Sequence, residues 1–100
     1  MKAVMKPDRS PGAEVREIDP PSIGDQDILL EVKAAAICGT DVHIYEWTKY
    51  AQDHVTPPMV FGHEFCGEVV EVGSQVTKVQ PGDLVAGETH IPCGHCFQCE

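Results

Sequence analysis

The stretch Asp-Ile-Leu-Leu-Glu-Val-Lys-Ala-Ala-Ala, residues 27–36, predicts a central β-strand. Alternate side chains of a strand point to opposite faces of its sheet. One predicted face is apolar and carries Ile28, Leu30, Val32 and Ala34. The other face is mixed and carries Leu29, Glu31 and Lys33. The strand is expected to deliver Cys38, which follows shortly after its end.

The segments before this strand are short, β-rich and separated by Gly and Pro. Residues 1–6 and 13–18 are expected to pair as a hairpin across residues 7–12, and residues 20–24 indicate an extended connector. No long stretch of the chain has the period of an amphipathic helix. These patterns together favour a mainly β domain.

The second half of the chain begins with a polar segment. Residues 47–59 contain Pro57-Pro58 and are typical of a surface loop. Residues 65–72 form a β-branched run that predicts a strand. A polar turn is expected to join it to a second strand at Leu84 and Val85.

Composition and charge exclude several classes of function. The chain has 100 residues, of which 42% are hydrophobic, and no apolar run approaches the roughly 20 residues that cross a bilayer. Acidic residues outnumber basic ones by 16 to 7, and the net charge of −9 repels phosphate backbones. We therefore expect neither a nucleic-acid nor a membrane partner. Residues 1–6 lack the apolar region of a secretory signal, which favours the cytoplasm.

Cysteine spacing predicts metal binding. Three of the five cysteines form the motif Cys93-x-x-Cys96-x-x-Cys99, in which each two-residue gap lets successive thiolates wrap one tetrahedral ion. A disulfide scaffold is the alternative, and the cytoplasmic setting disfavours it.

Cys38, His63 and Glu64 offer the thiolate, imidazole and carboxylate that zinc selects. They lie far apart in the sequence and can meet only through the fold, which is typical of a catalytic site. Adjacent strand residues point to opposite faces, so His63 and Glu64 can face one metal only if the backbone bends there. Gly62 permits that bend, and Glu64 either binds the metal directly or supports a ligand.

A short helical turn is expected after Cys38. Thr40 or Asp41 could cap a turn that continues to Tyr45, and Thr40 and His43, three residues apart, would then share a face. A hydroxyl that relays a proton to an imidazole would carry the released proton out of a water-poor site.

Three motifs carry a resemblance to a known family. ICGTDVHIYEW at residues 37–47, GHEFCGEVVEVG at residues 62–73 and PGDLVAGETHIPCGHCFQC at residues 81–99 resemble the N-terminal part of the zinc-dependent, medium-chain alcohol dehydrogenases. The resemblance implies a GroES-like, partly open β-barrel, with residues 1–100 forming an incomplete catalytic domain.

The resemblance also implies roles for the candidate residues. Cys38 and His63 would be catalytic zinc ligands, Glu64 a further ligand or exchange group, and Thr40 and His43 the charge relay. Zinc would act as a Lewis acid on the substrate oxygen.

The family further implies a structural zinc bound by four cysteines. Cys93, Cys96 and Cys99 would be three of them, in a lobe that starts at residues 93–99, and the fourth would lie outside this sequence. His95 is a less favoured alternative ligand. The sequence has no G-x-G-x-x-G fingerprint, so the family's Rossmann domain, which binds NAD, is expected outside this chain.

Within the family, CGTDVHIYEW at residues 38–47 is most similar to the branch that oxidises L-threonine to 2-amino-3-oxobutanoate with NAD. The chain would then be the N-terminal catalytic portion of a longer homotetrameric enzyme, inactive alone. The alternatives are a related polyol or vicinal-diol dehydrogenase, or a non-catalytic zinc-binding module if the chain is naturally this short.

Three further residues have weaker signals. Cys66 is expected to be a buried structural thiol, and His54 a loop residue. Glu88, Thr89 and His90 either approach the substrate side of the site or form a polar connector.

Overall fold

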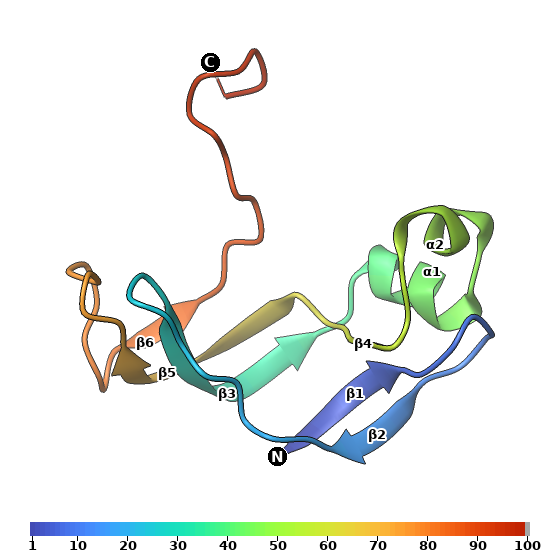
Figure 1. Ribbon diagram of the computed structural model, residues 1–100, viewed down its shortest axis with the longest axis horizontal. Helices are drawn as coiled ribbons and strands as arrows, with labels where there is room; N and C mark the ends of the chain where they lie inside the picture. The colour runs from blue at the N-terminus through green and yellow to red at the C-terminus, as the bar shows by residue number, and fades with distance from the viewer. Residues whose placement is uncertain (100) are drawn as a thin grey trace.

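Two three-stranded antiparallel sheets make up most of the molecule. The structure is a computed structural model, and it describes residues 1–99. The first sheet has the order β2 (Glu14–Glu17), β1 (Lys2–Lys6) and β4 (Met59–Val60). The second has the order β3 (Ile28–Ala36), β5 (Glu64–Val72) and β6 (Leu84–Ala86). Figure 1 shows the sheets side by side and not closed into a barrel, as expected of a mainly β, partly open architecture.

The predicted amino-terminal hairpin is confirmed. β1 pairs with β2 in antiparallel register, from Lys2 opposite Glu17 to Met5 opposite Glu14. Residues 18–24 have no regular secondary structure and carry the chain to the second sheet, as the proline-rich sequence predicts.

The predicted central strand is also confirmed, but its regular alternation is not. Register shifts occur between Leu29 and Leu30 and between Val32 and Ala34 along the β3–β5 ladder. Such irregularities rotate the side chains that follow them. Val32, predicted on an apolar face, is 56% exposed, because the described residues place no second layer over it. β3 is therefore stabilised by its pairing with β5 rather than by burial of its side chains.

Gly67 in β5 allows a close approach of the two strands. A Cβ atom at this position would lie 2.3 Å from the backbone oxygen of Glu31, a distance that no real Cβ contact shows. The glycine is therefore a requirement of the β3–β5 pairing. This pairing matters for function because it sets the relative position of the two segments that carry the candidate ligands.

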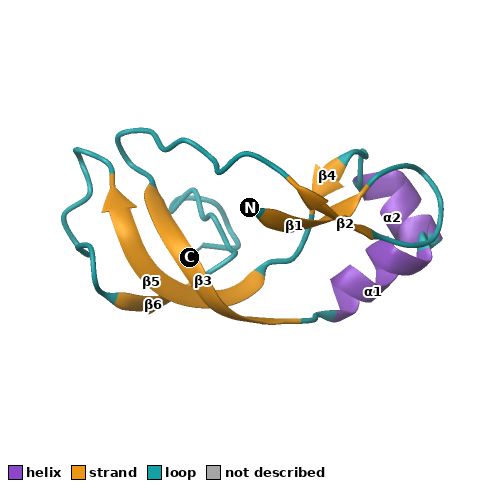
Figure 2. Cartoon of the chain, turned by 90° about the horizontal axis from the view of Figure 1, so that it is seen from below, coloured by secondary structure: helices purple, strands orange, loops and turns teal. Residues whose placement is uncertain are grey.

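The prediction of a surface loop over residues 47–59 is wrong in part. Two short helices, α1 (Gly39–Glu46) and α2 (Lys49–His54), pack together at one end of the molecule (Figure 2). Trp47 between them is 8% exposed and packs with Ile44 and Ala51. The six residues of α2 are too few for a helical period to show in the sequence, and the apolar contact with Trp47 stabilises it instead. His54, expected in a loop, is the last residue of α2.

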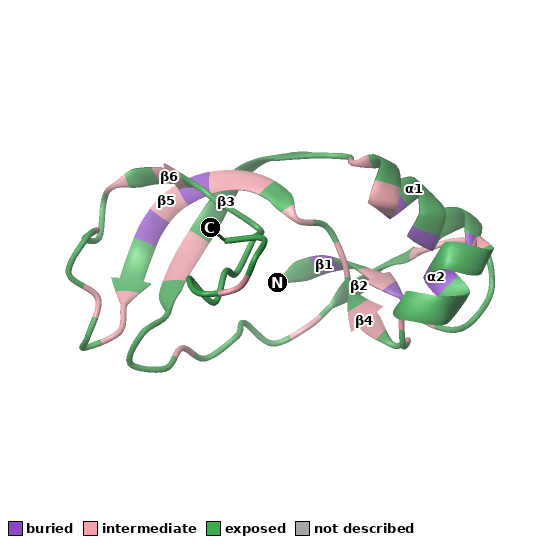
Figure 3. Cartoon of the chain, turned by 90° about the horizontal axis from the view of Figure 1, so that it is seen from above, coloured by how far each residue is buried: buried purple, intermediate pink, exposed green. Residues whose placement is uncertain are grey.

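A buried lysine connects β1 to the helical end. Lys6 has no exposed surface, and its ammonium group donates to the carbonyls of Ser10, Gly12 and Tyr45, the last two at 2.7 and 3.4 Å. It also lies 5.1 Å from the centre of the Trp47 ring. Burial lowers the pKa of Lys6, and the charge of Asp8 opposes that shift. Few other residues are buried (Figure 3), so this contact positions the helices that follow Cys38.

Candidate metal centre

Cys38 lies between the end of β3 and the start of α1. It is the N-cap residue of α1, with φ −97° and ψ 161°, so the expected N-cap at Thr40 or Asp41 is wrong in position, although Asp41 does contribute to a capping box. In that box the backbone N–H of Cys38 donates to Oδ2 of Asp41 at 3.0 Å, which fixes the first turn. The cysteine side chain is half-buried.

The strand register brings His63 and Glu64 to the same place. Ala36 lies opposite Glu64 in the β3–β5 ladder, and Cys38 follows two residues later. Gly62 has φ +112°, a conformation that favours glycine, and the chain bends there before β5 begins at Glu64. The predicted bend therefore exists. One sulfur of Cys38, one ring nitrogen of His63 and one carboxylate oxygen of Glu64 all lie within 4.8 Å of one another.

Asp41 was not predicted as part of this site. Its side chain is only 8% exposed, and Oδ1 lies 3.5 Å from Nδ1 of His63. Oδ1 is buried and accepts no hydrogen bond. From the sequence, Asp41 was predicted only as a possible helix cap. No pattern in the neighbouring residues indicates its contact with His63, which lies in a distant segment of the chain.

These residues fit a zinc ion by chemistry and by orientation. Sulfur, nitrogen and oxygen donors converge, and each is of a type that zinc binds. A neutral imidazole that gives its Nδ1 proton to a carboxylate leaves Nε2 free for a metal, and metal-bound histidines commonly have such a partner. The buried, unpaired Oδ1 of Asp41 is placed to accept that proton.

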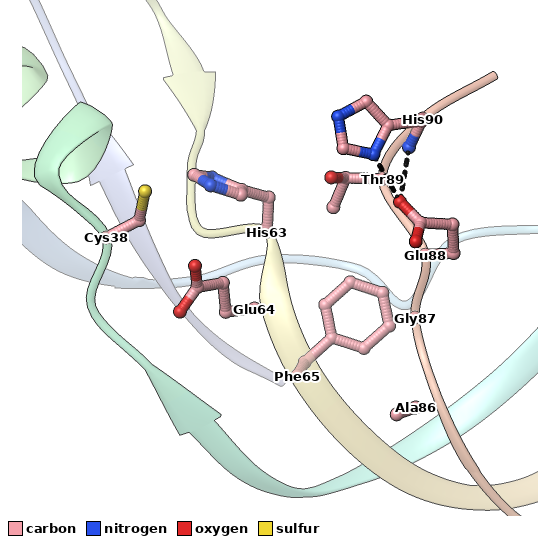
Figure 4. A pocket seen from close by; sticks show the side chains of 9 residues that line it. All are labelled: Cys38, His63, Glu64, Phe65, Ala86, Gly87, Glu88, Thr89 and His90. Atoms are coloured by element: carbon pink, nitrogen blue, oxygen red, sulfur yellow. Dashed lines mark hydrogen bonds and ion pairs between the residues drawn. The ribbon is translucent and has the colours of Figure 1, made fainter. Parts of the chain in front are cut away.

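The three converging side chains open onto a pocket of about 550 Å³ (Figure 4). Volumes of this size suit a small-molecule ligand. The opposite side of the pocket is the segment Ala86–His90, so Glu88, Thr89 and His90 do approach the site. The backbone and side-chain hydrogen bonds of His90 lower the pKa of the Glu88 carboxyl. Phe65 lies between the two sides and completes the lining.

Thr40 and His43 both lie on α1. Thr40 is half-buried and His43 is exposed. Nδ1 of His43 lies 3.0 Å from Oγ1 of Thr48, and its ring is 5.7 Å from that of Tyr50. Among the described residues, no hydrogen bond joins Thr40 to His43 directly. Thr48 therefore orients the ring, which sequence reasoning missed.

The predicted cysteine lobe brings a second set of candidate metal ligands together. Its three sulfurs lie within 4.8 Å of one another, with 3.5 Å between those of Cys96 and Cys99. The backbone N–H of Gly94 and the thiol of Cys96 lower the pKa of Cys99 to about 7, and the N–H of His95 lowers that of Cys93. Low thiol pKa values favour the thiolates that bind metal. The lobe stands apart from both sheets at the end of an extended arm (Figure 1).

Two other residues near these clusters stay outside them. His95 hydrogen-bonds through Nδ1 to the carbonyl of Cys93 at 2.9 Å and does not join the three sulfurs. Cys66 lies in β5, is half-buried and contributes to neither cluster of described residues. All five cysteines are free thiols.

Residues 24–100 match the family model described as the alcohol dehydrogenase GroES-like domain. The chain belongs to this family. The GroES-like fold expected from the three motifs is thereby confirmed, in an open form with two separate sheets.

Several members of the alcohol dehydrogenase GroES-like family are similar to this chain. The L-threonine 3-dehydrogenase of Bacillus licheniformis is 54% identical over 99 residues, which are 99% of this chain and 29% of the relative. Galactitol-1-phosphate dehydrogenase from Escherichia coli has a TM-score of 0.82 at 32% identity, over 99% of this chain and 28% of that structure. Zinc-dependent alcohol dehydrogenase 2 from Streptococcus pneumonia, in its apo form, has a TM-score of 0.77 at 36% identity, with the same coverage. The chain thus spans less than a third of the length of these relatives.

Neither helix of the described chain could cross a membrane. α1 has eight residues and α2 has six, whereas a spanning helix needs about 20 apolar residues.

Proposed function

We propose that this chain supplies the zinc-binding part of an NAD-dependent dehydrogenase that oxidises the secondary hydroxyl of L-threonine to give 2-amino-3-oxobutanoate. The observation that carries the proposal is the convergence of the Cys38, His63 and Glu64 donor atoms within 4.8 Å at the edge of a pocket. The similarity to the Bacillus licheniformis L-threonine 3-dehydrogenase along 99% of this chain supports the substrate.

The residues of this chain have distinct tasks in the proposed reaction. Cys38 and His63 bind the metal, and Glu64 binds it or exchanges with the substrate oxygen. Zinc at this position supplies Lewis-acid polarisation of the substrate hydroxyl. Asp41 holds the His63 ring so that one nitrogen faces the metal. Thr40 and His43 pass the hydroxyl proton towards solvent, which the exposure of His43 permits.

The cysteine lobe has a structural task in this proposal. Cys93, Cys96 and Cys99 bind a second zinc with a fourth ligand from the full-length protein. NAD binds to a Rossmann domain elsewhere in that protein, which assembles as a cytoplasmic homotetramer.

Other functions would use the same zinc chemistry differently. The similarity to galactitol-1-phosphate dehydrogenase makes a polyol or diol dehydrogenase the second candidate. A zinc-binding module without catalysis is the third.

A substrate comparison tests the proposal. We expect the full-length, zinc-loaded protein to form NADH from L-threonine with a kcat/KM at least about tenfold above those for a vicinal diol and a polyol, since a site built for one polar substrate strongly rejects analogues that leave its groups unpaired. Preference for a diol or polyol would contradict the proposal that L-threonine is the substrate, but would leave the proposed zinc chemistry in place. Zinc binding without NADH formation from any alcohol would favour the module.

The proton relay has its own test in the variant His43→Asn. An imidazole accepts protons near neutral pH, and asparagine does not. We expect kcat to fall about tenfold to hundredfold at low pH, and less at high pH, where hydroxide can take the proton. His54→Asn is the matched control, because His54 is also an exposed histidine in the last turn of a helix. A pH profile of His43→Asn identical to that of the control would remove His43 from the relay. Zinc content should stay unchanged in both variants.

A further inference from the structure

The pocket at the metal centre has an uneven distribution of polarity. Metal-binding side chains form one side, and the polar residues Glu88, Thr89 and His90 form the other (Figure 4). Phe65 lies between them, and Ala86 and Gly87 precede the polar residues on the second side. Phe65 is the one large apolar side chain among the described residues that line the pocket. A ligand that fills this pocket therefore has one place for an apolar group, against the Phe65 ring.

The backbone fixes where that ring lies. Phe65 follows Glu64 in β5 and pairs with Ala35 of β3. On its other side, its carbonyl accepts the N–H of Gly87 at 3.1 Å. The Phe65 backbone thus lies between two paired segments, opposite Ala35 of β3 and hydrogen-bonded to Gly87, which leaves it little freedom. The ring is thus held at a defined position one residue from a candidate metal ligand.

Gly87 gives the ring its space. A Cβ atom at residue 87 would lie 2.5 Å from Cζ of Phe65 and 2.7 Å from one of its Cε atoms. The ring therefore packs directly on the bare backbone of Gly87. Phe65 is only half-buried, so the rest of its surface is available to the pocket.

We propose that Phe65 is a specificity-determining residue whose ring contacts the alkyl substituent on the carbon that carries the reacting hydroxyl. For the reaction proposed above, on which this inference rests, that substituent is the methyl group of a β-hydroxy amino acid. Burial of a methyl group against an aromatic ring favours the substrate that has one. A substrate with a hydroxymethyl group there would place an unpaired hydroxyl against the ring.

The test compares substrates that differ only in this substituent, using the full-length, zinc-loaded protein. L-Threonine carries a methyl group, L-serine a hydrogen, and 3-hydroxynorvaline an ethyl group. We expect wild-type kcat/KM to favour threonine over serine about tenfold or more, because a single methyl in an apolar pocket gives that discrimination. Phe65→Ala should reduce the ratio to about twofold or less and raise relative activity on the ethyl substrate. Phe65→Leu, which keeps an apolar surface, should retain most of the ratio.

Gly87→Ala tests the same contact from the opposite side. The added methyl should push the ring into the pocket, so threonine and the ethyl substrate should lose activity relative to serine. Dissociation constants from calorimetry should follow the same order as kcat/KM. Zinc content and circular dichroism equal to those of wild type would exclude a folding defect as the cause.

The results of these tests distinguish failure of the Phe65 inference from failure of the proposal that L-threonine is the substrate. If threonine is not oxidised, the same ratio is measured with 2,3-butanediol and ethylene glycol, which also differ by methyl groups at the reacting carbons. A ratio that depends on Phe65 there keeps the inference while the substrate proposal fails. Ratios and dissociation constants unchanged by both Phe65→Ala and Gly87→Ala would show that the ring only packs on Gly87, and would overturn the inference.

Discussion

Cys38→Ala in the full-length protein is expected to lower kcat/KM about a thousandfold and to reduce zinc from two ions per chain to one. The sulfur of Cys38 is the donor from the β3 side of the pocket, and the other two candidate ligands come from the start of β5. Without it, His63 and Glu64 remain, which are too few for a stable site. Loss of Lewis-acid stabilisation worth about 4 kcal/mol corresponds to a thousandfold in rate. Steady-state kinetics and elemental analysis measure the two effects.

Cys66→Ala is the matched control for this variant. Cys66, like Cys38, is a half-buried free thiol, and it lies only two residues after Glu64. It contributes to neither convergent cluster. We expect it to keep two zinc ions and near wild-type kinetics. Equal loss of zinc in both variants would indicate a general loss of structure, and full activity of Cys38→Ala would exclude it from the metal centre.

Local patterns in the sequence predicted most of the strands. Alternating and β-branched runs, bounded by Gly and Pro, anticipated the β1–β2 hairpin, β3, β5 and β6. These signals depend only on neighbouring residues. The exposure of β3 was not predicted, because it depends on what covers the sheet and on the register shifts after Leu29 and Val32. Helix α2 was not predicted because its stability also depends on tertiary packing, here around Trp47.

For the candidate site too, some features were predictable from local sequence and others were not. Residue type and spacing were enough to select Cys38, His63 and Glu64, and the glycine at residue 62 was enough to anticipate the bend between them. The contact between Asp41 and His63 joins two segments that only the β3–β5 register brings together. No local pattern carries that information. The role of these residues as zinc ligands stays a prediction that the variants test.

Asp41→Asn is expected to weaken zinc binding at the candidate metal centre about tenfold to hundredfold, the usual effect of losing the carboxylate behind a metal-bound histidine. An asparagine oxygen can still accept the N–H of Cys38, which Oδ2 accepts at 3.0 Å. Its NH₂ group would then face Nδ1 of His63, 3.5 Å from the present Oδ1, and two donors would oppose each other. The His63 ring would lose the partner that sets its tautomer. Competition with a chelator measures the zinc dissociation constant.

Asp83→Asn separates this effect from simple loss of a turn, because the two aspartates make the same local contact. Oδ2 of Asp83 accepts the backbone N–H of Gln80, three residues earlier, at 3.0 Å, just as Oδ2 of Asp41 accepts that of Cys38. Asp83 is not among the residues that line the pocket. Zinc affinity should therefore fall in Asp41→Asn and stay unchanged in Asp83→Asn. If both variants bind zinc as tightly as wild type, the buried Oδ1 of Asp41 does not act on the metal through His63, and its task is confined to the first turn of α1.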